Sequence, residues 1–102
     1  MMYYQAMDIL TLEEIKIKTL PILKEAGITK ASLFGSYVRG DQTDKSDVDI
    51  LVSFPEDTTL IDVARLKRHL ENQLNKQIDL VSYKSIHPLL KDEILSSQYP
   101  VL

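Results

Sequence analysis

Cysteine and tryptophan are absent from the 102 residues of this chain, and glycine and proline occur only three and four times. The lack of cysteine excludes disulfide bonds and cysteine-ligated zinc or iron–sulfur centres. The low glycine and proline content, together with 44% hydrophobic residues, disfavours long disordered segments and flexible linkers. We therefore expect a single domain, residues 1–102, that buries a hydrophobic core without covalent staples.

Long apolar runs and a surplus of basic residues are also lacking. No stretch approaches the about 20 apolar residues of a membrane span, and residues 1–10 lack the basic start and apolar core of an export signal. The formal net charge of −3 disfavours a surface devoted to nucleic acid, because such binding depends on clustered Lys and Arg. We expect a cytoplasmic protein with no membrane partner and no direct contact with nucleic acid.

Hydrophobic periodicity predicts alternating helices and strands. Thr11 and Glu14 form a capping-box pattern at the start of a helix over 12–26, and Gly27 is its expected stop. Pro21 lies inside that helix and predicts either a kink or two shorter helices, because proline removes a backbone hydrogen bond. Further along the chain we expect a strand at 30–34, a helical turn at 36–40, a strand at 48–54, a helix at 60–74, a strand at 77–82 and a helix at 88–97.

The order of these elements predicts an α+β protein of two layers, in which helices flank a small mixed three-stranded sheet. The apolar faces of three helices should pack toward the core. The residues expected on those faces are Leu12, Ile15, Ile22, Leu23 and Ala26 in the first helix, Leu60, Val63, Ala64, Leu66, Leu70 and Leu74 in the second, and Leu90 and Ile94 in the last.

Residues 33–40, with the sequence LFGSYVRG, join the first expected strand to the helical turn. Gly35 would let the backbone approach a phosphate closely, and Ser36 would donate a hydroxyl at the start of the turn, where free N–H groups favour an anion. The side chain of Arg39 can reach back to the same turn and bind phosphate oxygens bidentately. A Gly-Ser pair alone is a weak signal, so its meaning depends on the residues around it.

Two aspartates lie at the start of the next strand. Asp47 and Asp49 are two residues apart, so their carboxylates point to the same side, close enough to coordinate one Mg²⁺ jointly or to bridge two. If the strand at 77–82 lies beside this one, Asp79 adds a third carboxylate, either as the general base or as a ligand of a second metal ion. These residues together predict a site for Mg²⁺ and a nucleoside triphosphate.

These segments resemble a known family. Residues 33–40 and 46–52 closely resemble the minimal nucleotidyltransferase (MNT) domains of the DNA polymerase beta superfamily, and residues 78–81 match the strand that carries the family's third carboxylate. The resemblance implies the nucleotidyltransferase fold and an Mg²⁺-dependent transfer of a nucleotidyl group, usually AMP from ATP, with release of pyrophosphate. It implies catalysis and metal binding by Asp47, Asp49 and Asp79, and nucleotide binding by Gly35, Ser36 and Arg39.

The same resemblance implies a partner. Stand-alone MNT proteins of this size are typically antitoxins encoded beside a HEPN-domain ribonuclease toxin, which they silence by adding AMP to one of its tyrosines. We therefore expect a complex with a HEPN toxin that serves as the acceptor. The length of the chain supports an external acceptor, because 102 residues leave no room for the additional domains with which larger members hold a primer, a tRNA or an antibiotic.

Other interpretations are open to the sequence. A binding antitoxin could occlude its partner without catalysis, although three like charges would then repel one another for no gain. A nucleic-acid-binding domain would conflict with the negative net charge. The acceptor could also lie in the chain itself, at Tyr3, Tyr4 or Tyr37.

Overall fold

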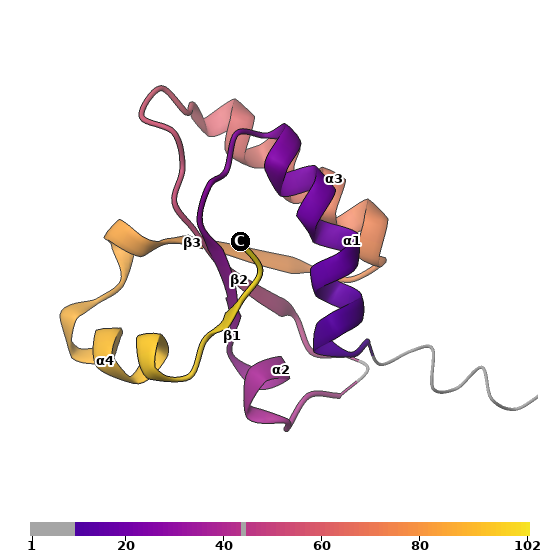
Figure 1. Ribbon diagram of the computed structural model, residues 1–102, viewed down its shortest axis with the longest axis vertical. Helices are drawn as coiled ribbons and strands as arrows, with labels where there is room; N and C mark the ends of the chain where they lie inside the picture. The colour runs from indigo at the N-terminus through magenta and orange to yellow at the C-terminus, as the bar shows by residue number, and fades with distance from the viewer. Residues whose placement is uncertain (1–9, 44) are drawn as a thin grey trace, which may run out of the picture.

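The computed structural model describes residues 10–43 and 45–102. Helices and strands alternate along the chain as expected, and their bounds agree with the predicted ones to within two residues (Figure 1). The elements are α1 (Leu12–Glu25), β1 (Ala31–Phe34), α2 (Ser36–Arg39), β2 (Val48–Val52), α3 (Leu60–Leu74), β3 (Ile78–Ser82), the 3₁₀ turn η2 (Tyr83–Ser85), α4 (Pro88–Ser96) and β4 (Tyr99–Pro100).

The sheet is mixed, and its strands lie in the order β3-β2-β1-β4. Strand β1 is antiparallel to β2 and to β4, whereas β2 and β3 are parallel. The α+β fold is confirmed, but the sheet has four strands rather than the expected three. The added strand is two residues long and contains Pro100, which the sequence presented only as a helix stop; proline is compatible with an edge strand because one side of that strand needs no donor.

Helix α1 begins and ends as its sequence predicts. Thr11 and Glu14 form the capping box, with both backbone-to-side-chain distances at 3.1 Å. At the other end the amide of Gly27 donates to the Lys24 carbonyl and the next amide reaches the Leu23 carbonyl, the paired bonds of a Schellman motif. Pro21 lies within one continuous helix, so of the two expected outcomes, a kink or two shorter helices, the second is wrong.

Helices α1 and α3 cover one face of the sheet and enclose the hydrophobic core (Figure 1). Several residues expected in this core lie outside it. Leu60, the first residue of α3, is 88% exposed, and Leu90 in α4 is 50% exposed. Ala26 is exposed as the cap residue beyond the last turn of α1, and Ala64 of α3 is exposed as well. Fully buried side chains from four elements form the centre of the core, including Ile15, Leu23, Leu33, Val48, Ile50 and Leu70.

Helix α4 lies on the other side of the sheet, connected to it through the segment that follows β3 (Figure 1). The Tyr83 hydroxyl lies 3.0 Å from the Ser32 hydroxyl of β1 and 3.2 Å from the side-chain oxygen of Gln98. These contacts hold both ends of the α4 segment against the second face of the sheet. Among the helices of the described residues, none is long and apolar enough to cross a membrane.

Candidate active site

The turn between β1 and α2 depends on Gly35. Its φ of +81° and ψ of −150° lie in a region that is almost restricted to glycine. A Cβ atom at this position would also collide with the carboxylate of Asp49, which lies opposite Phe34 in the antiparallel register. Glycine therefore lets the turn and the carboxylate occupy neighbouring positions, as the predicted phosphate turn requires.

Helix α2 places Ser36 at the mouth of this turn. The amides of Val38 and Arg39 donate to the Gly35 carbonyl at 3.1 and 3.0 Å, and Gly40 ends the helix in the left-handed conformation. Tyr37 is only 2% exposed and packs in the hydrophobic core, so it fixes the orientation of the short helix.

The hydroxyl of Tyr37 is buried too. Tyr37 is therefore not accessible as an acceptor for AMP. The other two tyrosines considered as internal acceptors, Tyr3 and Tyr4, lie outside the described residues.

The predicted adjacency of the aspartates is confirmed. Asp47 directly precedes β2, and Asp49 lies in β2 opposite Asp79 of the parallel strand β3. Val48 and Ile50, which alternate with the aspartates, point into the core and are fully buried. The carboxylates therefore belong to the opposite face of the sheet, away from α1 and α3.

Burial and neighbouring negative charges raise the pKa of Asp49 from 3.8 to about 6. Burial is the largest cause, because it disfavours the charged carboxylate, and the negative charges of Asp79 and Asp47 act in the same direction. Arg39 opposes these effects with its positive charge. A cation near these carboxylates would offset their mutual repulsion.

A cavity of about 480 Å³ opens at this place. Asp79, although it lies beside Asp49 in the sheet, does not line it. The Arg39 guanidinium is largely exposed and its Nε lies 3.3 Å from Asp41 Oδ2, so it forms an ion pair at the rim. The lining residues are Phe34, Gly35, Ser36, Arg39, Ser46, Asp47 and Asp49 from the sheet side, and Leu90, Glu93 and Ile94 from α4.

The α4 residues of this lining were not predicted as part of a site. They are more than 40 positions from Asp49 in the chain, and the sequence has no motif that pairs α4 with the turn after β1. Ser46 directly precedes Asp47, and this proximity was the one signal that could have identified it.

The donor set suits Mg²⁺, because carboxylate oxygens are its preferred protein ligands. Asp47 and Asp49 would hold the ion from one strand, and Asp79 could add a third ligand from the next. Within residues 10–43 and 45–102, however, no three acidic or histidine side chains already converge on one point. Binding of an ion by all three aspartates would therefore require their side chains to turn toward one another.

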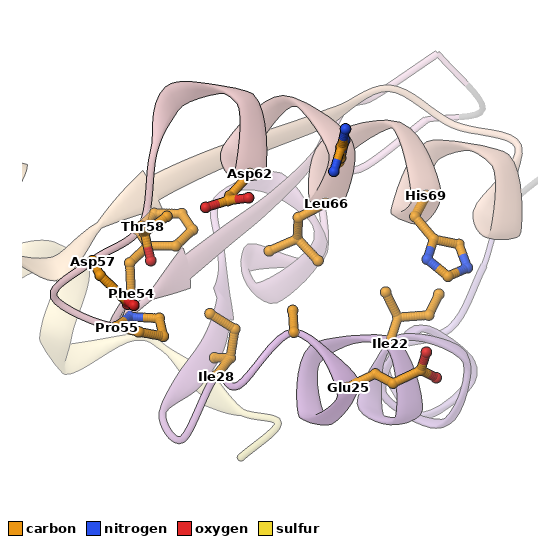
Figure 2. Close-up of a pocket in the computed structure, with 12 residues that line it drawn as sticks. Ile22, Glu25, Ile28, Phe54, Pro55, Asp57, Thr58, Asp62, Leu66 and His69 are labelled. Atoms are coloured by element: carbon orange, nitrogen blue, oxygen red, sulfur yellow. The ribbon is translucent and has the colours of Figure 1, made fainter.

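A larger cavity, of about 620 Å³, lies elsewhere, between α1 and α3 (Figure 2). Its floor is apolar, with Ile22, Ile28 and Leu66, and Asp62 and His69 stand at its edge. None of the six predicted site residues lines it. The smaller cavity is the candidate active site, because the glycine turn and two of the predicted aspartates meet there and the larger cavity contains none of them.

Comparisons with known proteins identify the family of the chain. Residues 8–102 match the family model described as polymerase beta, nucleotidyltransferase. The chain is 50% identical over 93 residues to MJ0435 of Methanocaldococcus jannaschii, a candidate protein adenylyltransferase; the match covers 91% of this chain and 100% of that protein. It is 42% identical over 84 residues to the protein adenylyltransferase MntA of Thermococcus cleftensis, covering 78% of this chain and 85% of the relative.

A solved structure shows the same fold. A toxin–antitoxin crystal structure with AMP-PNP contains a chain that superimposes with a TM-score of 0.74 and 26% identity, over 85% of this chain and 72% of that one. The chain therefore belongs to the polymerase beta nucleotidyltransferase family, as a minimal nucleotidyltransferase of the protein adenylyltransferase group.

Proposed function

We propose that this chain is an antitoxin that transfers AMP from ATP to a tyrosine hydroxyl of a partner HEPN toxin and thereby silences it. The observation that carries the proposal is the meeting of the Gly35–Ser36 turn with Asp47 and Asp49 at one cavity, with Asp79 in register beside them. The solved toxin–antitoxin complex with the ATP analogue AMP-PNP supports both the nucleotide and the kind of partner.

In this reaction the acceptor oxygen attacks the α-phosphorus of ATP, the bond to the β-phosphate oxygen breaks, and pyrophosphate leaves. Ser36 and the backbone at Gly35 would hold the phosphates, and Arg39 would add positive charge at the rim. Asp79 would accept the acceptor's proton or complete the coordination of a second metal ion. When bound, Mg²⁺ would neutralise phosphate charge and align the nucleotide with the acceptor.

The acceptor is expected on another protein, because no tyrosine of the described residues lines the cavity. Tyr37, the nearest tyrosine in sequence to the phosphate turn, is buried in the core. An external acceptor also agrees with the relatives, which are named as protein adenylyltransferases.

The proposal is tested by incubating the chain with labelled ATP, Mg²⁺ and the product of the neighbouring gene, which we expect to be the HEPN protein. We expect label on the HEPN protein, loss of transfer in EDTA, and loss of transfer in the Asp47→Asn/Asp49→Asn double variant. A matched control is Glu56→Gln/Asp57→Asn, which removes two exposed carboxylates from the turn between β2 and α3 and should transfer normally.

Absence of label with the unaltered chain would contradict the proposal. Full transfer by the aspartate double variant would contradict the assigned roles. Normal neutralisation of the toxin by a double variant that transfers nothing would instead favour a non-catalytic antitoxin that occludes its partner.

A further inference from the structure

Helix α4 carries an apolar stripe that the described part of the chain leaves uncovered. Leu89 is 85% exposed, Leu90 is 50% exposed, and none of the nine residues of α4 is buried. On a helix of 100° per residue, Leu89, Glu93, Leu90 and Ile94 succeed one another around roughly 140° of the surface. Exposed leucines that occur singly are ordinary, but Leu89 and Leu90 lie on the same side of the helix as the half-buried Ile94, with the Glu93 side chain among them.

This stripe continues into the active-site cavity. Leu90, Glu93 and Ile94 line the same cavity as Ser36 and Asp49. Leu89 is not part of the lining and lies at the outer edge of the stripe. A molecule that placed a group in the cavity and spread over the surrounding surface would therefore meet Leu89 next.

Helix α4 also depends on contacts beyond its own backbone. An isolated helix of this length is marginal in water, because its nucleation cost is shared by few hydrogen bonds. Local hydrogen bonds fix both of its ends. The Leu89 amide donates to the ring nitrogen Nδ1 of His87 at 3.1 Å, and the side-chain amide of Gln98 donates to the Leu95 carbonyl at 3.1 Å. These contacts set the position of the helix without burying its apolar side.

We propose that α4 is the surface on which the acceptor protein docks, with Leu89 buried in an apolar depression of that protein. The inference deepens the proposed function and rests on it, because it assumes a protein acceptor. A nucleotide alone would not explain the exposed Leu89, since its base could pack on Leu90 and Ile94 in the cavity but Leu89 lies outside it. A protein that presents a hydroxyl to the cavity must contact its rim, and α4 forms the apolar part of that rim.

The test compares Leu89→Asp with Leu60→Asp. Both leucines are almost fully exposed, at 85% and 88%, and both lie in the first turn of a helix, where an added aspartate is compatible with the helix dipole. The probe is the HEPN protein encoded beside this chain, and its dissociation constant is measured by calorimetry without ATP. Circular dichroism of both variants verifies that they are folded.

We expect Leu89→Asp to weaken binding at least about tenfold, the loss that corresponds to one leucine side chain removed from an interface, and Leu60→Asp to bind as the unaltered chain does. The affinity for Mg²⁺-ATP should be the same in all three proteins. Amides of α4 should also gain protection from hydrogen exchange in the complex.

Unchanged binding by Leu89→Asp, or equal weakening by both variants, would overturn the inference. So would a dimer of the chain alone that Leu89→Asp dissociates while acceptor binding persists, because the stripe would then serve self-association. Failure of the unaltered chain to bind the HEPN protein would overturn both proposals. Binding without AMP transfer would contradict the proposed function alone, since the binding measurement does not require catalysis.

Discussion

Asp49 of β2 and Asp79 of β3 lie directly opposite each other on parallel strands, so two like charges share one part of the sheet. The charge of Asp79 is, after burial, the largest cause of the raised pKa of Asp49. In the proposed reaction, this pair would place negative charge where a cation and a triphosphate bind. The repulsion between these carboxylates should be measurable in the stability of the folded chain and in its activity.

The metal-free chain should lose stability as the pH rises through about 6. The folded-state pKa of Asp49 is raised, so the protonated form is favoured on folding; its stabilising effect is complete below the unfolded pKa and disappears above about 6. Asp49→Asn, which cannot ionise, should therefore be more stable than the unaltered chain at about pH 8 in EDTA and equally stable below about pH 4. Urea unfolding at both pH values measures the difference, and a variant less stable at about pH 8 would contradict this explanation.

Mg²⁺ should restore the folding stability that repulsion between the aspartates removes. Binding of the ion to the ionised aspartates favours the folded state, by an amount that rises with the logarithm of the free ion concentration above its dissociation constant. The unaltered chain should therefore melt at a higher temperature in Mg²⁺ than in EDTA at about pH 8, and Asp47→Asn/Asp49→Asn should show no such increase. An equal increase in both proteins would place the ion elsewhere.

Gly35→Ala should abolish transfer and destabilise the fold, because the added Cβ collides with Asp49 and the backbone conformation is strained for alanine. Gly40→Ala is the matched control. Its φ is +84°, but a Cβ there meets nothing within 4 Å, so only the backbone cost of about 1–2 kcal/mol applies. Unfolding and AMP transfer are measured on both variants, and a Gly35→Ala variant as active as Gly40→Ala would contradict the close approach of the turn to Asp49.

Arg39→Ala should raise the KM for ATP about tenfold, the effect of losing roughly 1.4 kcal/mol of interaction with the phosphates. Its effect on the free energy of unfolding should stay below about 0.5 kcal/mol, because the ion pair with Asp41 is exposed. Asp41→Asn removes the same ion pair and should leave the KM for ATP unchanged. If both variants raised the KM equally, Arg39 would act only through its ion pair.

Val101→Ala should destabilise the chain by about 2 kcal/mol, because the Val101 side chain is 5% exposed and alanine would leave part of its space in the core empty. The control is Ile17→Ala in α1, where the side chain is 63% exposed and the loss should stay below about 0.5 kcal/mol. Urea unfolding compares the two. Equal losses would show that the C-terminal strand contributes little to the fold.

The correctly predicted elements depend on local signals, and the misassigned residues depend on long-range contacts. The cap at Thr11, the periodicity of β2 and α3, and the glycine turn each depend on residues close together in the chain, so the sequence alone predicted them. Strand β4 has two residues and exists only through pairing with β1, which no local pattern reveals.

The residues of the candidate site divide in the same way, into those with local signals and those brought in by long-range contacts. Asp49 and the Gly35 turn could be identified from spacing, and the adjacency of Asp79 required only that β3 lie beside β2. The contribution of α4 was missed because Leu90 was expected to face the core. Helical periodicity identifies the side of a helix on which apolar residues gather, but it cannot show whether those residues pack on the same chain or remain exposed.

The most direct test of AMP transfer is the intact mass of the HEPN partner after incubation with ATP and Mg²⁺, with and without this chain. We predict a mass increase of one or more AMP units, located on tyrosine by peptide fragmentation, and no increase with Asp47→Asn/Asp49→Asn. An unchanged partner mass with the unaltered chain, or the same increase with the double variant, would contradict the proposed reaction.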